Sequence, residues 1–268
     1  MVPTCRVAAM YRYPVKGLSP QATRHADLAS GGFFPGDRLY AVENGSSGFD
    51  EAAPAHLPKA QFLSLMQCPA LALIASRYNE PDRTLTLRRN GEAVHGDLAT
   101  PAGRELIADF LARHLPAGDL RGPLRLLAAP DGFRFTDSRR GFVSVVNLAS
   151  VAALEDWVSG PVDPLRLRAN LYVEGWPAFA ELDLVGRTLA FASGARLKVI
   201  KRIQRCTGAD VDPRTGRRDL HIPRTLMVQL DHADCGIYCE VLTSGRIDEG
   251  ERFMVEPAES PDPAAEPR

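Results

Sequence analysis

Short stretches of apolar and β-branched residues, separated by Gly, Pro and Asn, recur along most of this 268-residue chain. Asn90-Gly91 lies between two such stretches, and an Asn-Gly pair in this position is typical of a tight β-hairpin. Many short strands between turn residues are typical of barrel-like β structure. We therefore expect an α+β, β-rich protein with β-barrel structure and a few helices.

Two segments have the apolar spacing of helices. The first follows Thr100, which can cap a helix, and Pro101, which suits the first helical position. Its expected apolar stripe consists of Leu106, Ile107, Phe110, Leu111 and Leu115. The second helix is expected around residues 149–157, where three alanines, Leu154 and Trp157 supply much of the apolar face.

The chain is expected to divide near residue 122, because the stretch "PAGDLRGP" has the composition of a linker. The predicted first domain is residues 1–122, with a surface loop at 44–58, and the second is 123–257. Residues 258–268 are rich in Pro, Ala and Glu, which predicts a disordered tail.

Two stretches of the second domain carry polar groups or cysteines on expected strands. In "LRLRANLYV", alternation would place Arg166, Arg168 and Asn170 on one face of a strand and the leucines on the other. In "CGIYCEV", the same alternation would place Cys235 and Cys239 on one face.

Charge and hydropathy exclude several classes of protein. The formal net charge is −1, so the chain lacks the basic surplus that marks a nucleic-acid or membrane-surface protein. No apolar run approaches the roughly 20 residues that span a bilayer. The N-terminal segment is too polar for a signal peptide, so we expect a cytoplasmic protein without nucleic-acid or membrane partners.

The five cysteines form no recognisable framework. They include no C-x-x-C pair and no Cys/His quartet with zinc spacing, and four thiolates at iron–sulfur spacing are missing. Disulfides are also not expected in a reducing compartment. Any cysteine chemistry in this chain would therefore use one thiolate at a time, and no iron–sulfur cluster is expected.

Several polar residues are candidates for anion binding, each with a simpler structural interpretation. Arg166, Arg168 and Asn170 on one strand face would suit a phosphate or a planar polar ligand, or would form a solvated outer face. Asn147 and Ser150 stand at an expected helix start, where they either cap the helix or hold an anion.

Lys16 and Arg38 are further candidates for anion binding. Lys16 lies in a turn between a proline-containing segment and Gly17, and could donate to a phosphate or be simply solvated. Arg38 opens an expected strand after Gly36-Asp37, a pair that a turn alone explains.

Cys206 and Cys235 are the candidate reactive cysteines. Cys206 ends an apolar strand, where it would be either a small core residue or a thiolate favoured by nearby arginines, if Arg205, Arg217 and Arg218 converge on it. Cys235 lies at a loop-to-strand junction, a position from which a side chain can face a cleft.

Taken in order, five segments resemble the MOSC family, named after the C-terminal domain of molybdenum cofactor sulfurase. "YRYPVKGLSP" and "GDRLYAV" resemble its N-terminal β-barrel domain. The MOSC domain proper is resembled by "RLRANLYVEG", "RCTGADVDPRTGRRD" and "GIYCEVLTSGRIDEGERFMV". The resemblance covers nearly the whole chain and implies a MOSC β-barrel packed with an N-terminal β-barrel-like domain.

The resemblance implies a bound molybdenum cofactor, a pterin dithiolene whose metal takes a cysteine thiolate from the protein. By position, Cys235 corresponds to the metal-binding, catalytic cysteine of the family's reductases, whereas Cys206 corresponds to the cysteine noted in the sulfurase domain. The cofactor-binding residues that the resemblance implies are Lys16, Arg38, Asn147, Ser150, Arg168, Asn170 and Cys206.

Two functions follow from the resemblance. The first is a molybdenum-dependent reductase of N-hydroxylated or N-oxygenated small molecules, similar to the amidoxime-reducing component, with electrons from a separate ferredoxin- or flavin-type protein. The second is a carrier of the cofactor, or of sulfur as a cysteine persulfide, without reductase activity. Pyridoxal phosphate is associated with the wider sulfurase family, and four lysines (Lys16, Lys59, Lys198 and Lys201) are the only Schiff-base candidates that we identify.

Overall fold

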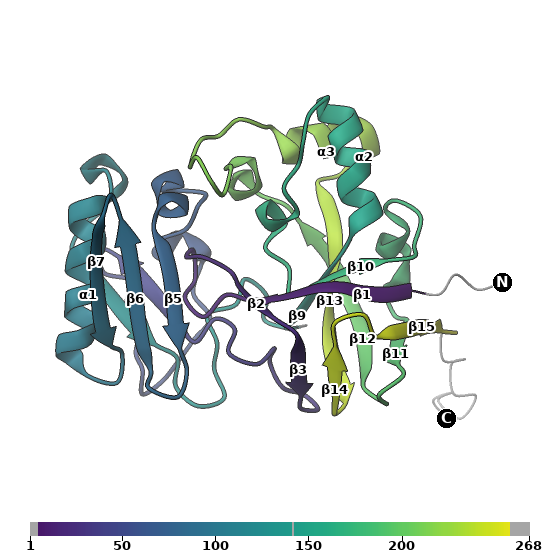
Figure 1. Cartoon of the computed structure of the whole chain (residues 1–268), viewed down its shortest axis with the longest axis horizontal. Coiled ribbons are helices and arrows are strands. Elements are labelled where there is room, and N and C mark those ends of the chain that lie inside the picture. The colour runs from purple at the N-terminus through teal and green to yellow at the C-terminus, as the bar shows by residue number, and fades with distance from the viewer. Residues whose placement is uncertain (1–4, 141, 258–268) are drawn as a thin grey trace, which may run out of the picture.

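The computed structural model describes residues 5–140 and 142–257 and consists of two units side by side (Figure 1). One unit contains α1 and the sheet of β5, β6 and β7, and the other is built around a barrel. The prediction of a β-rich α+β protein is confirmed. Within the described residues, three α-helices accompany fifteen strands and several short 3-10 helices.

The barrel closes with seven strands in the order β1, β10, β9, β13, β12, β11 and β15, after which β15 pairs with β1. Closure gives each of the seven strands a paired neighbour on both sides. The strands are β1 (Cys5–Arg12), β9 (Val143–Asn147), β10 (Leu171–Glu174), β11 (Thr188–Phe191), β12 (Arg196–Gln204), β13 (Asp234–Thr243) and β15 (Arg252–Glu256). Alternate residues such as Leu197 and Val199 point into an apolar interior.

Beside the barrel, β2 (Gln21–Thr23) extends β1, and β3 (His25–Leu28) pairs with β14 (Gly245–Asp248). β9 and β10 are parallel neighbours, so the chain needs a crossover between them, and α2 (Leu148–Val158) supplies it. α3 (Ile222–Leu230) packs against α2 on the outside of the barrel, where Leu154 and Leu226 help to form a second apolar cluster. The predicted helix near 149–157 is therefore confirmed.

The other unit has two small sheets and one helix. β4 (Tyr40–Asn44) pairs with β8 (Leu124–Ala128), and β5 (Ala75–Asn79), β6 (Thr84–Arg89) and β7 (Glu92–Asp97) form the second sheet. The Asn90-Gly91 hairpin is confirmed, because both residues have positive φ, 50° and 82°, as a tight primed turn requires. The short 3-10 helices among the described residues are Lys59–Gln61, Pro69–Leu73, Ala117–Asp119, Pro164–Leu167, Ala180–Leu184 and Thr207–Asp210.

α1 (Pro101–His114) starts as predicted, with the Thr100 side chain accepting a hydrogen bond from the Gly103 N–H at 3.0 Å. One member of its predicted stripe was wrong. Leu106 is 52% exposed, whereas Ile107 and Phe110 are buried. Adjacent helical residues are turned by about 100° from each other, so a stripe centred on Ile107 leaves its neighbour near its edge.

The expected boundary at residue 122 does not separate the strands of one unit from those of the other. β8 follows that boundary and pairs with β4, and β1 precedes it and belongs to the barrel. Each unit therefore contains strands from both sides of residue 122, although the boundary itself stays a prediction. The predicted tail at 258–268 lies outside the described residues.

The expected strand through Arg166, Arg168 and Asn170 was wrong. Residues 164–167 form a short 3-10 helix, Arg168 ends it in the left-handed region at φ 50°, and the strand begins only at Leu171. The cause is local, because Pro164 suits the first position of a helix and Asp163 caps it through a hydrogen bond from the Leu165 N–H.

Cys235 and Cys239 were wrongly expected on one strand face. Cys239 belongs to the barrel interior, whereas Cys235 packs in the outer cluster with α2 and α3. Between them Gly236 has φ +84°, which breaks the strand alternation. A Cβ at this residue would lie 2.6 Å from the Val145 carbonyl oxygen, so the local backbone requires glycine.

Candidate functional site

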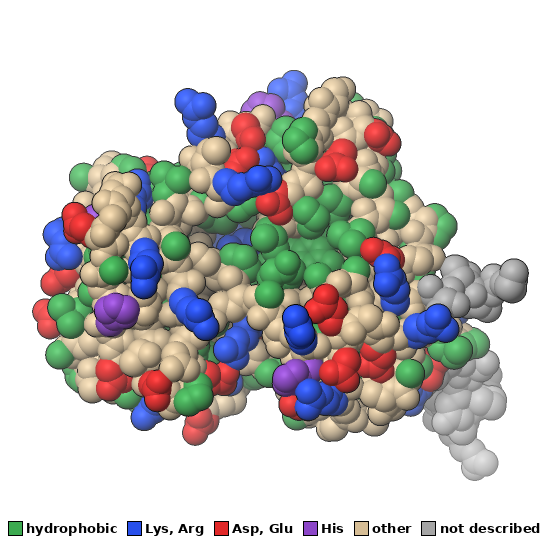
Figure 2. All heavy atoms as spheres, viewed as in Figure 1, with side chains coloured by type: hydrophobic (Ala, Val, Ile, Leu, Met, Phe, Trp, Pro, Cys, Tyr) green, Lys and Arg blue, Asp and Glu red, His purple; other side chains and the backbone are tan. Residues whose placement is uncertain are grey.

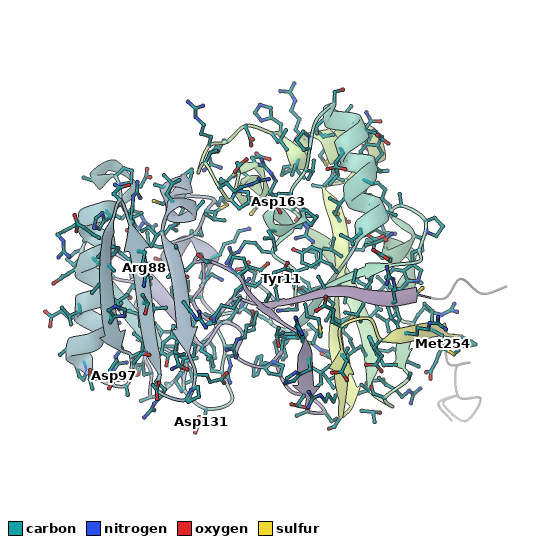
Figure 3. All side chains as sticks on the ribbon, in the orientation of Figure 1. Tyr11, Arg88, Asp97, Asp131, Asp163 and Met254 are labelled. Carbon is teal, nitrogen blue, oxygen red and sulfur yellow. The ribbon has the colours of Figure 1, made fainter. Side chains whose placement is uncertain are left out.

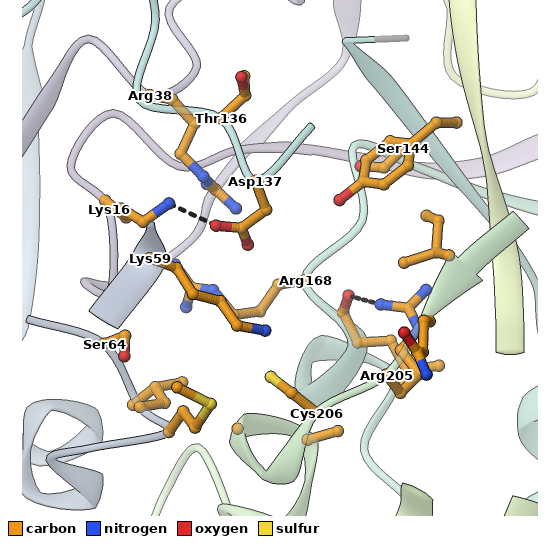
Figure 4. A pocket seen from close by; sticks show the side chains of 18 of the residues that line it. Lys16, Arg38, Lys59, Ser64, Thr136, Asp137, Ser144, Arg168, Arg205 and Cys206 are labelled. Atoms are coloured by element: carbon orange, nitrogen blue, oxygen red, sulfur yellow. Dashed lines mark hydrogen bonds and ion pairs between the residues drawn. The ribbon is translucent and has the colours of Figure 1, made fainter. Parts of the chain in front are cut away.

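A cavity of about 700 Å³ lies between the two units and takes its lining from both. Figure 2 shows the surface hollowed in this region, and Figure 4 shows the cavity from close by. Of the described residues that line it, eight are Lys or Arg and two are Asp. Such a concentration of positive charge inside a chain with a net charge of −1 is suited to an anionic ligand.

Lys16 lies almost fully buried in the cavity wall, 6% exposed, and its ammonium group forms an ion pair with Asp137 (Figure 4). It also donates a hydrogen bond to the Phe135 carbonyl at 3.0 Å. Burial lowers the pKa of Lys16, and Asp137 opposes that effect. Burial alone would raise the pKa of Asp137, but the neighbouring Lys16 lowers it to about 2. The carboxylate is therefore ionised at neutral pH.

Arg38 and Arg168 converge on one tyrosine from different parts of the chain. Their guanidinium carbons lie 4.7 and 4.3 Å from the centre of the Tyr13 ring. Both residues have a left-handed backbone, with φ of 52° and 50°. Strained conformations of this kind recur at ligand-binding sites. Burial, followed by the charge of Arg38, lowers the pKa of Arg168 to about 10.

Asn170 is buried at the cavity, but its side-chain amide already forms hydrogen bonds with other protein groups. Its oxygen accepts hydrogen bonds from the N–H and the hydroxyl of Ser144, and its nitrogen donates to the Tyr11 carbonyl at 3.2 Å. Tyr11, near the centre of Figure 3, packs edge-to-face on Tyr172 at 5.7 Å. Asn170 therefore fixes the start of β10 between β1 and β9.

Cys206 lines the cavity, and its half-buried side chain points into it (Figure 4). It precedes a short helix, Thr207–Asp210. Of the three arginines expected near it, Arg205 also lines the cavity and donates to the Leu167 and Cys235 carbonyls at 2.6 and 2.7 Å. Arg218 instead donates to the Thr207 and Met66 carbonyls, which joins this segment to the other unit.

Cys235 does not line the cavity. Its side chain is 0% exposed within the outer apolar cluster, and burial raises the pKa of its thiol to about 12. Its carbonyl oxygen, rather than its sulfur, is tied to Arg205. The structure thus brings Lys16, Arg38, Arg168, Asn170 and Cys206 together and leaves Cys235 in the core.

Asn147 and Ser150 also lie away from the cavity lining. The Asn147 side chain caps α2 by accepting from the Ala149 N–H at 3.2 Å, and it donates to the Pro177 carbonyl at 2.8 Å. The Ser150 hydroxyl donates to the buried Glu181 carboxylate at 2.8 Å. The Asn147 bonds agree with the helix-cap interpretation, whereas Ser150 lies within α2 and binds Glu181 instead of capping the helix.

Sequence reasoning missed other lining residues, among them Ser64, His56 and Tyr238. The Ser64 hydroxyl is buried and has no hydrogen-bond partner among the described residues, although it lies at the cavity (Figure 4). No local signal could have found it, because "FLSLMQC" has the composition of an ordinary core segment.

Two models of known protein families match this chain. Residues 133–254 match the MOSC domain, and residues 4–114 match the MOSC N-terminal beta barrel domain. Together the two matches span most of the sequence, and the chain belongs to the MOSC family. The MOSC domain is associated with binding of the molybdenum cofactor and with enzymes that use it.

The solved structures that are similar to this chain include two bacterial proteins. The YUAD protein from Bacillus subtilis is 16% identical, with a TM-score of 0.46 over 94% of this chain and 95% of that one. YiiM from Geobacillus stearothermophilus is 18% identical, with a TM-score of 0.35 over 44% of this chain and 55% of that one. No curated protein matches the sequence significantly.

Residues 5–140 and 142–257 lack two kinds of feature. These residues contain no group of three or more His, Cys, Asp or Glu side chains that could hold a metal ion. None of their helices has both the length and the apolar character needed to cross a bilayer.

Proposed function

We propose that this chain binds the molybdenum cofactor in the cavity between its two units and reduces N-hydroxylated small molecules. The observation that carries the proposal is the combination of a cluster of Lys and Arg side chains with one cavity-lining thiol, Cys206. Guanidinium groups bind phosphate strongly, and thiolates are soft ligands suited to molybdenum. MOSC membership supports the same cofactor.

The donor groups of the cavity fit such a cofactor. The unpartnered Ser64 hydroxyl is a buried polar atom that a ligand in the cavity would satisfy. Cys206 would hold the metal, and Arg168 with Arg38 would hold the phosphate. When bound, the cofactor would supply a metal that exchanges two electrons.

Cys206 is our choice of metal ligand in place of Cys235, which the family resemblance favours. A ligand must reach the cavity as a thiolate. Cys206 lines the cavity, whereas Cys235 is enclosed by apolar side chains that oppose its ionisation. The assignment rests on this difference in access.

The proposed reaction converts R–NH–OH, two electrons and two protons into R–NH₂ and water, with cleavage of the N–O bond. The electrons would come from a separate ferredoxin- or flavin-type protein. Asp137, ionised with a pKa of about 2, is too weak a base to take up a proton at neutral pH and has no proton to donate there. Its role is therefore to position the Lys16 ammonium group in the cavity wall.

The test starts from protein purified from a host that makes the cofactor, with bound molybdenum and pterin measured first. We expect Cys206→Ser to lose most of the molybdenum and Cys235→Ser to keep it. Wild-type protein without molybdenum would contradict the proposal, and loss of metal in Cys235→Ser alone would reverse the ligand assignment.

Activity is then measured with reduced viologen dye as donor and benzamidoxime or hydroxylamine as substrate. Oxidation of the dye that depends on both substrate and Cys206 is the expected result. Bound molybdenum without turnover of either substrate would favour the carrier function instead.

A further inference from the structure

The cavity contains more positive charge than its own acidic groups neutralise. Four of its eight cations form ion pairs with carboxylates: Lys16 with Asp137, Arg38 with Asp37, Arg166 with Asp212 and Asp219, and Arg202 with Asp183. The other four form no ion pair within the described part of the chain: Lys59, Arg168, Lys201 and Arg205. Both acidic lining residues, Asp37 and Asp137, are already engaged.

These four cations differ in what their side chains contact. Arg168 and Arg205 donate to backbone carbonyls, Arg168 to Leu18 at 2.8 Å and Arg205 to Leu167 at 2.6 Å. The ammonium groups of Lys59 and Lys201 make no hydrogen bond with a described residue. A lysine with no acidic partner on the wall of a cavity leaves its charge available to a ligand.

Lys201 is held at the cavity by an aromatic neighbour. It lies on β12 directly opposite Tyr238 of β13, and its Nζ is 5.6 Å from the centre of the Tyr238 ring. Both side chains line the cavity, as does Phe142. A cation over a ring face gains a favourable interaction and loses side-chain freedom, which prepares it to bind.

We propose that the substrates of this chain are anionic, namely N-hydroxylated compounds that carry a carboxylate, and that Lys201 binds this carboxylate. The inference rests on the proposed function and adds the class of substrate. The proposed function assigns Arg168 and Arg38 to the phosphate of the cofactor, which leaves the charge of Lys201 for the substrate. A positive cavity also attracts anionic molecules during association.

The experiment compares two substrates of the cofactor-loaded protein, benzamidoxime and 4-carboxybenzamidoxime. In both, ArC(NH₂)=N–OH takes two electrons and two protons and gives ArC(NH₂)=NH and water. We expect a higher kcat/KM for the carboxylated compound. Lys201→Gln should lower its kcat/KM about tenfold, as loss of a hydrogen bond to a charged group would, with little effect on benzamidoxime.

The matched control is Lys198→Gln, because Lys198 lies on the same strand but does not line the cavity. It should leave both substrates unchanged. Equal kcat/KM for the two substrates in the wild type, or an equal loss for both in Lys201→Gln, would overturn the inference while leaving the reductase function intact.

A binding measurement separates this inference from the proposed reaction. Calorimetry with terephthalate and with its neutral diamide should show binding of the dianion only, weakened about tenfold in Lys201→Gln. This result without turnover of either amidoxime would contradict the reductase function and support an anion-binding cavity. Equal binding of the dianion and the diamide would overturn the inference whatever the activity.

Discussion

Lys16 and Asp137 lie 121 positions apart in the chain and meet in the cavity wall. Lys16 is buried, and its charge there is tolerated because Asp137 and a backbone carbonyl contact it. Removing one member of such a pair leaves the other charge without compensation. The pair therefore decides whether the buried Lys16 ammonium group keeps its charge in the cavity wall.

Asp137→Asn should lower the pKa of Lys16 further, because burial then acts without the opposing carboxylate. It should also change acid stability. The pKa of Asp137 falls from 3.8 in the unfolded chain to about 2 in the folded one. Its contribution is therefore present above pH 4 and is lost as the pH falls through 2. We expect urea unfolding at pH 7, 4 and 2.5 to show a shallower acid loss in the variant.

The matched control for this prediction is Asp131→Asn, at an exposed residue of the same segment (Figure 3). It should unfold with the same dependence on pH as the wild type. An Asp137→Asn protein whose stability falls between pH 4 and 2.5 as steeply as that of the wild type would contradict the assignment.

Ser64 carries a buried hydroxyl without a partner, which costs folding free energy. Ser64→Ala should raise the free energy of unfolding of the cofactor-free protein by up to about 1 kcal/mol. The same variant should retain less molybdenum and pterin after purification. Denaturant unfolding and metal analysis measure the two effects separately.

Ser144→Ala is the contrasting variant, because the Ser144 hydroxyl also lies at the cavity but donates to Asn170 at 2.8 Å. It should lose stability rather than gain it. A Ser64→Ala protein that is destabilised like Ser144→Ala would show that the Ser64 hydroxyl has a structural partner.

At the scale of elements, one glycine determines which side of β13 the Cys235 side chain faces. Gly236 has a left-handed backbone and lies against the Val145 carbonyl of β9. Gly236→Ala should destabilise the protein by about 2 kcal/mol or more, through backbone strain and the contact with β9. Thermal or urea unfolding of the cofactor-free protein measures the loss.

Gly194→Ala is the control that separates backbone strain from the contact with β9. Gly194 has φ +91°, but a Cβ there would meet no atom within 4 Å, so only backbone strain of about 1 kcal/mol should appear. Equal losses in the two variants would mean that the contact between Gly236 and β9 contributes nothing.

At the scale of the whole molecule, the N-terminal strand closes a barrel made otherwise from the second half of the chain. β1 pairs with β10 on one side and β15 on the other. A fragment of residues 123–257 would lack this strand and expose two open edges. We expect the fragment to aggregate or to unfold without a cooperative transition, as followed by circular dichroism.

Fusing residues 5–28 to that fragment through a flexible linker should restore a cooperative transition, because they contain β1 to β3. The added segment supplies the missing barrel strand and the partner of β14. A fragment of residues 123–257 that folds cooperatively alone would show that the barrel does not need β1.

Local signals sufficed where neighbours in the sequence determine the backbone. The Asn90-Gly91 hairpin and the start of α1 at Thr100 follow from turn geometry and helix capping. Local reasoning failed at two places, where the alternating side-chain directions of a strand were expected. Residues 164–167 instead form a short helix, and Gly236 has a positive φ that interrupts the alternation. The first failure affected residues that line the cavity, and the second misplaced Cys235, which lies in the core.

The sequence by itself determined a β-rich fold, its hairpin and helices, the MOSC family and four of the eight cationic residues that line the cavity. Only the tertiary structure decided that Cys206 reaches the cavity and Cys235 does not, and that Ser64 and Lys201 line it. The physical reason is that exposure depends on contacts between distant segments. Arg38 and Arg168, for example, meet at Tyr13 only because the two units pack together.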